Sequence, residues 1–167
     1  MPRPFVMWPD ARLRRIADPV EAVTDEVRAI WDEMLEAMYA MPGVGLAAPQ
    51  LGINLRLAVV DCSAAQNAPI RLANPEILHA SVKLRAHEEA SPNLPGVSAT
   101  IERPRAVTVR YLDETGAAVE RDFVQLEATS VQHQIDHLNG QLFISHLGPV
   151  KRKMLVEKSR KWQRRGG

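Results

Sequence analysis

Apolar residues recur at three- and four-residue steps early in the chain, which predicts an amphipathic helix from about Thr24 to Met41. The apolar stripe of this helix, which we assign to the core, consists of Val23, Val27, Ile30, Met34 and Met38. Thr24 is a suitable N-cap, and Pro42 and Gly43 end the helix. The preceding segment, residues 6–20, mixes prolines with charges and is predicted to be a loop or extended arm.

Short apolar or alternating runs bounded by turn residues predict several strands in the middle of the chain. The predicted strands cover residues 55–61, 70–73, 77–86, 106–111 and 119–124. The last two are expected to form a hairpin around a turn at residues 113–116. The glycine- and alanine-rich residues 43–50 favour a tight turn, and the prolines in residues 88–97 argue against a regular central strand there.

The second half of the chain returns to helical patterns. A helix is predicted from about Leu126 to Leu138, because an Asn-Gly pair follows as a stop signal. One more short strand is predicted over residues 142–146, and a last helix is expected to begin near Pro149. Helix, then strands, then helices is the element order of an α+β protein.

Composition places this pattern in an ordinary globular protein. The 167 residues suit a single domain spanning residues 1–167, with 46% hydrophobic and 25% charged residues. The net charge of +1 gives no global attraction to nucleic acid or membrane, and no apolar run approaches the roughly 20 residues needed to cross a bilayer. Cys62, the one cysteine, is expected to be a buried, inert thiol, and a cytoplasmic location is expected.

The candidate chemistry lies in the second predicted helix. His133 and His137 are four residues apart, so a helix places both imidazoles on one face, where they can hold one metal ion. Metallohydrolases with such a helix use a carboxylate beside the first histidine to take a proton from the attacking water. This chain has Gln134 there, whose amide does not titrate.

The last predicted helix is strongly basic. It has a single acidic residue, Glu157, against Lys151, Arg152, Lys153, Lys158, Arg160, Lys161, Arg164 and Arg165. Such a face is usually only solvated, and the alternative is contact with an anionic partner such as RNA.

Three motifs together resemble one family, the peptide deformylases, which remove the formyl group from the N-terminal methionine of new proteins. Residues 43–50 match the family pattern G-x-G-x-A-A-x-Q in full. Residues 88–95 stand where the family has E-G-C-L-S, and residues 133–137 stand where it has H-E-x-D-H. The resemblance extends over the whole chain. It implies an α+β fold in which small antiparallel sheets surround the metal-binding helix.

In this family a divalent metal, natively iron and often replaced by zinc or nickel, is held by one cysteine and two histidines. The resemblance assigns the two histidines to His133 and His137, and the cysteine position to Ser91. A hydroxyl is a weaker ligand than a thiolate, so an unfilled site with no bound metal is one expectation. A third ligand from His87, Glu88 or Glu89 is the alternative, and Asp136 is expected to orient an imidazole.

Two further positions depart from the family pattern. The family's oxyanion hole combines a glutamine side chain, here Gln50, with a backbone N–H, and Pro92 has no N–H at that position. The catalytic glutamate maps to Gln134. With Ser91 these changes lead to the hypothesis of a pseudoenzyme that binds ligands and has lost efficient deformylation. The alternatives are a working metallohydrolase with a rebuilt site, acting on formyl-methionine or a related amide, and a fold kept for a protein contact.

The resemblance also names a substrate pocket and partners. By position, the methionine pocket is lined by Val44, Leu126, Thr129 and Ser130, with Gly45 and Pro92 next to the peptide. Thr129 and Ser130 are more polar than the family's usual residues there. The expected partner is a nascent peptide N-terminus or a small ligand, and the basic C-terminal helix resembles one that some deformylases use to dock on ribosomes.

Overall fold

A computed structural model describes residues 2–166 of the chain. Its helices are α1 (Asp25–Ala40), α2 (Gln125–Leu138) and α3 (Pro149–Arg164), with 3₁₀ turns at Ala11–Arg14, Ala48–Leu51 and Phe143–His146. Its strands are β1 (Gly45–Ala47), β2 (Leu57–Val60), β3 (Ile70–Ala80), β4 (Leu84–Ser91), β5 (Leu94–Pro104), β6 (Ala106–Leu112) and β7 (Ala118–Val124). All named strand pairs are antiparallel.

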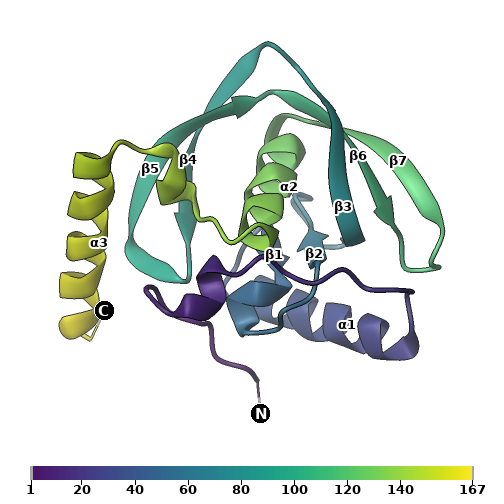
Figure 1. Ribbon diagram of the computed structural model, residues 1–167, viewed down its shortest axis with the longest axis horizontal. Coiled ribbons are helices and arrows are strands. Elements are labelled where there is room, and N and C mark those ends of the chain that lie inside the picture. Colours follow the sequence, from purple (N-terminus) through teal and green to yellow (C-terminus); the bar gives the residue numbers. More distant parts are fainter. Residues whose placement is uncertain (1, 167) are drawn as a thin grey trace.

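The strands form two sheets around a central helix. Five of them pair in the order β1-β2-β3-β6-β7, and β4 pairs with β5 in a separate two-stranded sheet. Helix α2 runs through the middle of the molecule, between these sheets, whereas α1 lies along the base and α3 on the outer side of β5 (Figure 1). This is the α+β arrangement that the sequence predicts.

The prediction for the first helix is confirmed, because its signals are local. The Thr24 hydroxyl accepts a hydrogen bond from the backbone nitrogen of Val27 at 3.2 Å, as an N-cap does. The stripe packs into the main core, in which Met34 and Met38 are fully buried. Trp31 is also fully buried and donates its indole N–H to the carbonyl of Leu72.

The strand predictions between residues 70 and 104 need correction. Residues 70–80 form one continuous strand, and the segment 77–86 is divided between β3 and β4. The proline-containing segment 88–97, which the sequence excludes as a regular central strand, belongs instead to the β4–β5 hairpin. Each strand of a two-stranded sheet has one free edge, where a residue without an N–H removes no hydrogen bond between strands. Pro95 is therefore tolerated within β5, and Pro92 lies in the turn.

Three smaller predictions also differ. Residues 43–50 contain the short strand β1 followed by a 3₁₀ turn, and residues 143–146 form a 3₁₀ turn in place of a strand. The loop before residue 20 contains the 3₁₀ turn Ala11–Arg14. Cys62 lies just past β2 and is half-buried, where the sequence predicts a buried thiol, and burial raises the pKa of this thiol to about 11.

The last helix begins at Pro149 as predicted and packs against β5. Ser159 is fully buried and donates a hydrogen bond to the carbonyl of Pro95 at 2.6 Å, and the Trp162 ring covers Gly96, where a Cβ atom would lie 2.4 Å from it. All the basic residues of the helix are exposed. Contact with ribosomal RNA through them stays a prediction. Across residues 2–166, no helix is both long and apolar enough to span a membrane.

Candidate active site

A cavity of about 380 Å³ opens where β1, β4 and α2 meet. It brings together nearly all the site residues that the sequence nominates: Val44, Gly45, Gln50, Ser91, Pro92, Leu126, Thr129, Ser130, His133 and Gln134. His137 and Asp136 are the nominated residues outside the lining, and His137 contacts His133, which lines the cavity. Residues from three distant parts of the sequence thus line one cavity.

The two histidines converge as their spacing predicts. Their Nε2 atoms are 3.2 Å apart, and both rings are buried. Burial, with smaller contributions from His133 and Arg103, holds the pKa of His137 well below its usual range, so this imidazole is neutral at pH 7. The neutral form is the one that binds a metal. The Nδ1 atom of His137 is buried without a hydrogen-bond partner among residues 2–166.

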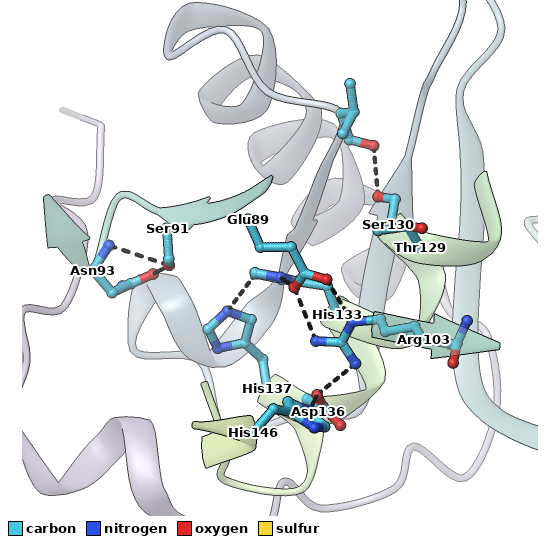
Figure 2. A network of polar contacts seen from close by, with 12 residues as sticks. Glu89, Ser91, Asn93, Arg103, Thr129, Ser130, His133, Asp136, His137 and His146 are labelled. Carbon is cyan, nitrogen blue, oxygen red and sulfur yellow. Dashed lines mark hydrogen bonds and ion pairs between the residues drawn. The ribbon is translucent and has the colours of Figure 1, made fainter. Parts of the chain in front are cut away.

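A buried carboxylate orients the first histidine (Figure 2). Glu89 lies on β4, and its Oε1 atom is 2.8 Å from Nδ1 of His133, which leaves Nε2 facing His137. Arg103 of β5 donates to both carboxylate oxygens of Glu89, at 2.7 and 2.9 Å. Glu89 therefore sits on the far side of the ring from the converging nitrogens, and the expectation that it could serve as a third metal ligand is not supported by this geometry.

Asp136 does not orient either imidazole of the pair, which corrects the sequence-based expectation. Its Oδ2 atom lies 2.9 Å from Nη1 of Arg103 and 2.7 Å from Nε2 of His146. No local pattern in the sequence singles out Arg103 or His146 as parts of the site. Arg103 is 4% exposed and bridges two carboxylates, and a buried arginine requires such partners.

The ion pairs around Glu89 predict that the protein becomes less stable to unfolding at low pH. Burial raises the pKa of Glu89, but hydrogen bonds from His133 and Arg103 outweigh it and hold this pKa at about 2. Because the pKa of Glu89 is lower in the folded state than its value near 4.5 in the unfolded state, the ionised carboxylate stabilises the fold. This stabilisation is fully present above about pH 4.5 and is lost as the pH falls toward 2. We expect Glu89 to account for about 3 kcal/mol of such loss, measured by urea unfolding between about pH 6 and pH 2.5. A flat profile over that range would contradict it.

The Ser91 hydroxyl is held by its own loop. It donates to Oδ1 of Asn93 at 3.0 Å, and the side-chain nitrogen of Gln50 lies 2.6 Å from the same oxygen. Asn93 is fully buried and donates in turn to the carbonyl of Val6 at 2.5 Å. Gln50 is fixed from its other end, because its Oε1 accepts from the backbone nitrogen of Ala47 at 2.8 Å. The altered loop is therefore well ordered by hydrogen bonds, and Asn93 is a residue that sequence reasoning missed.

Gln134 is packed against the backbone of β1. An added Cβ at Gly45 would lie 2.4 Å from both the Gln134 side-chain nitrogen and the Ser130 hydroxyl, so any larger residue there would have to displace these two side-chain ends. The Oε1 atom of Gln134 is buried and has no partner within the described chain. An unpaired buried acceptor costs about 1–3 kcal/mol, so this side chain is held at a local energetic cost.

The metal implied by the resemblance can be tested against these residues. The two imidazoles converge through their Nε2 atoms, and a carboxylate orients the His133 ring from its Nδ1 atom. This arrangement suits the two nitrogen ligands of a divalent metal. Within residues 2–166, however, no group of three or more histidine, cysteine, aspartate or glutamate side chains is arranged to hold a metal. The residues thus fit a metal through His133 and His137, and no third side chain of these types is placed to hold it with them in the described residues.

Fold and site together define a class: an α+β protein whose central helix presents a buried His-x-x-x-His pair to a cavity. A family model described as polypeptide deformylase matches residues 2–153. The chain belongs to this family.

Individual relatives agree with the family match. A peptide deformylase of Methylocella silvestris is 46% identical over 164 residues, covering 95% of this chain and 84% of the relative. One of Hydrogenovibrio crunogenus is 44% identical, covering 94% and 92%. The crystal structure of a peptide deformylase from Legionella pneumophila superposes with a TM-score of 0.92 at 40% identity, covering 98% of this chain and 96% of that one.

These comparisons overturn one expectation from the sequence. The hypothesis of a pseudoenzyme that has lost efficient deformylation is contradicted, because curated relatives at 42–46% identity over most of the chain carry the name peptide deformylase. Ser91, Pro92 and Gln134 remain real departures from the family pattern. The finding favours the alternative, an active enzyme whose site operates with these residues.

Proposed function

We propose that this protein is a metal-dependent amide hydrolase that removes the formyl group from the N-terminus of peptides. The observation that carries the proposal is the convergence of the two imidazole Nε2 atoms, 3.2 Å apart, beside a cavity that also holds the side-chain amides of Gln50 and Gln134. The relatives named peptide deformylase support the same activity.

His133 and His137 would hold a divalent metal, iron or zinc, which supplies Lewis-acid polarisation of the formyl carbonyl when bound. Glu89 and Arg103 fix the orientation of the His133 ring through the contact at Nδ1. Ser91 lines the same cavity and offers a hydroxyl oxygen in place of a thiolate.

Gln50 and Gln134 have different roles in this proposal. The side-chain nitrogen of Gln50 is a donor that is positioned by two hydrogen bonds, and it is suited to stabilise the developing oxyanion, to which Pro92 contributes no N–H. The Gln134 side chain lines the same cavity, and its amide is the group at the family's general-base position that could orient the attacking water by a hydrogen bond. An amide does not retain the proton, which must pass on to solvent or substrate.

The direct test is formate release from a formyl-methionyl tripeptide by purified protein loaded anaerobically with Fe²⁺, or with Ni²⁺ or Zn²⁺. We expect turnover that depends on metal and disappears with a chelator. If none of the three metals supports formate release above that of the metal-free protein, the proposed function is wrong.

Restoring a carboxylate at position 134 should accelerate the reaction. A positioned general base contributes roughly 10²–10⁴ in rate, so Gln134→Glu is expected to raise kcat by about that factor at pH 7. Gln141→Glu, the same change at an exposed position shortly after α2, is the charge-matched control and should leave kcat unaltered. An unchanged kcat in a folded Gln134→Glu protein with wild-type metal content would show that the proton leaves by another route.

A further inference from the structure

Asn93 is a fully buried polar residue in the turn between β4 and β5, directly after the lining residues Ser91 and Pro92. Both ends of its side-chain amide are hydrogen-bonded. The nitrogen donates to the carbonyl oxygens of Val6 at 2.5 Å and Gln50 at 3.1 Å, whereas the oxygen lies 2.6 Å from Nε2 of Gln50. A buried amide with this many partners is held by the fold in one orientation.

That orientation is set by backbone groups that can only accept or only donate. Carbonyl oxygens accept, so the end of the Asn93 amide that faces the carbonyls of Val6 and Gln50 is the nitrogen. The backbone N–H of Ala47 can only donate, so the end of the Gln50 side chain that lies 2.8 Å from it is the oxygen. The two side-chain amides therefore meet oxygen to nitrogen, and the Gln50 nitrogen faces Asn93.

The N-terminal arm holds this pair in place. The backbone nitrogen of Trp8 donates to the carbonyl of Asn93 at 2.9 Å, and the backbone nitrogen of Val6 donates to the carbonyl of Gln50 at 2.8 Å. The Val6 side chain is buried in the same apolar cluster as Leu94, the first residue of β5. The arm thus bonds to both loops, although it is far from each of them in the sequence.

One N–H of Gln50 remains for the reaction. A carboxamide nitrogen has two hydrogens, and the contact with Asn93 takes one of them. Within residues 2–166 the nitrogen has one further contact, a long one of 3.4 Å to the Ser91 hydroxyl oxygen, and Gln50 lines the cavity. Because Pro92 has no N–H, Gln50 is the remaining donor of the family's oxyanion pair. Its orientation therefore matters more here than in a site with two donors.

We propose that Asn93 is a positioning residue for the reaction: braced by the N-terminal arm, it holds the Gln50 carboxamide with one N–H available to the developing oxyanion. Oxyanion donors stabilise a transition state because they are oriented before the charge develops. Without the Asn93 oxygen, the Gln50 nitrogen loses the short hydrogen bond that fixes it. This inference rests on the proposed function and assigns a part of its site.

The test is a double-mutant cycle on kcat and KM for formyl-Met-Ala-Ser with metal-loaded protein. Asn93→Ala should lower kcat by about tenfold or more and change KM by less than about threefold, because the donor acts on charge that develops in the transition state. Gln50→Ala should lower kcat by about 10²–10³. Since Asn93 acts through Gln50, the double variant Gln50→Ala/Asn93→Ala should match Gln50→Ala within about a factor of two.

The control is Asn67→Ala, the same change at an exposed asparagine, which should leave kcat and KM unchanged. An unchanged kcat in folded Asn93→Ala protein would overturn the inference. So would a double variant slowed by the product of the two single effects, because a purely structural residue acts independently of Gln50.

A second readout needs no turnover. In isotope-labelled protein, the carboxamide resonances of Gln50 are assigned by their loss in Gln50→Ala. The short hydrogen bond to Asn93 should shift one carboxamide hydrogen downfield and protect it from deuterium exchange. Asn93→Ala should abolish both effects, while the Trp31 indole N–H, which is bonded to the carbonyl of Leu72 in the core, keeps its protection.

The outcomes separate this inference from the proposed function. If no formyl peptide is turned over, the proposed function fails, and the spectra decide whether Asn93 orients Gln50. If Asn93→Ala does not fold, Asn93→Ser, which leaves a smaller cavity, replaces it in both experiments. The wild-type spectrum is a test in either case. Gln50 carboxamide hydrogens separated in chemical shift by more than those of the exposed Gln66 support the inference, and an equal separation overturns it.

Discussion

Replacing His133 or His137 with alanine is expected to abolish stoichiometric metal binding and to lower formate release by about 10³ or more. Each ring supplies one of the two converging nitrogens, and a single imidazole does not retain a divalent ion in this cavity. Lewis-acid polarisation of a carbonyl supplies several kcal/mol of transition-state stabilisation, and each 1.36 kcal/mol or so corresponds to about a factor of ten. Metal content by elemental analysis and formate release together measure the effect.

The control for this experiment is His79→Ala, which removes an exposed imidazole from β3. It should leave both metal content and turnover unchanged. His137→Ala is the more informative of the two site variants, because His133→Ala also leaves the Glu89 carboxylate without one of its partners. Metal retention at one ion per chain in a folded His137→Ala protein would show that the metal is held elsewhere.

Arg103→Met is expected to destabilise the fold by about 3–5 kcal/mol, a large share of the total stability of a domain of this size. The arginine is buried and pairs with Glu89 and Asp136, so its removal leaves an uncompensated carboxylate inside the protein. Methionine keeps most of the side-chain volume, which limits any cavity effect. The measurement is urea unfolding at pH 7.

Arg110→Met, on the exposed face of β6, is the matched control and should change stability by no more than about 0.5 kcal/mol. A double variant, Glu89→Gln/Arg103→Met, removes both charges and should recover part of the loss. Equal stability of Arg103→Met and the wild type would mean that the network does not contribute to folding as its burial implies.

Local signals were sufficient for the helices and for the histidine pair. The three- and four-residue periodicity, the Thr24 cap and the i, i+4 spacing of His133 and His137 act within a few residues, and all are found in the structure. The family resemblance likewise depended on short motifs and is confirmed. The β4–β5 hairpin was missed, because proline tolerance depends on whether a strand has neighbours on both sides.

Residue identities alone also led to a wrong prediction about activity. That prediction rested only on comparing Ser91, Pro92 and Gln134 with a family pattern, position by position. The relatives named peptide deformylase contradict the loss of activity that those three positions suggested.

The fold class, the helix that carries the two histidines and the family all depend on spacing along the chain, so the amino-acid sequence was enough to establish them. The packing of distant segments was needed to settle which carboxylate orients His133, why Arg103 is buried, and that Arg85 approaches Thr129 beside the cavity. These contacts join residues 14 to 44 positions apart, and no local preference encodes them. They arise from the way β4, β5 and α2 pack, which fixes where each buried charge must find its partner.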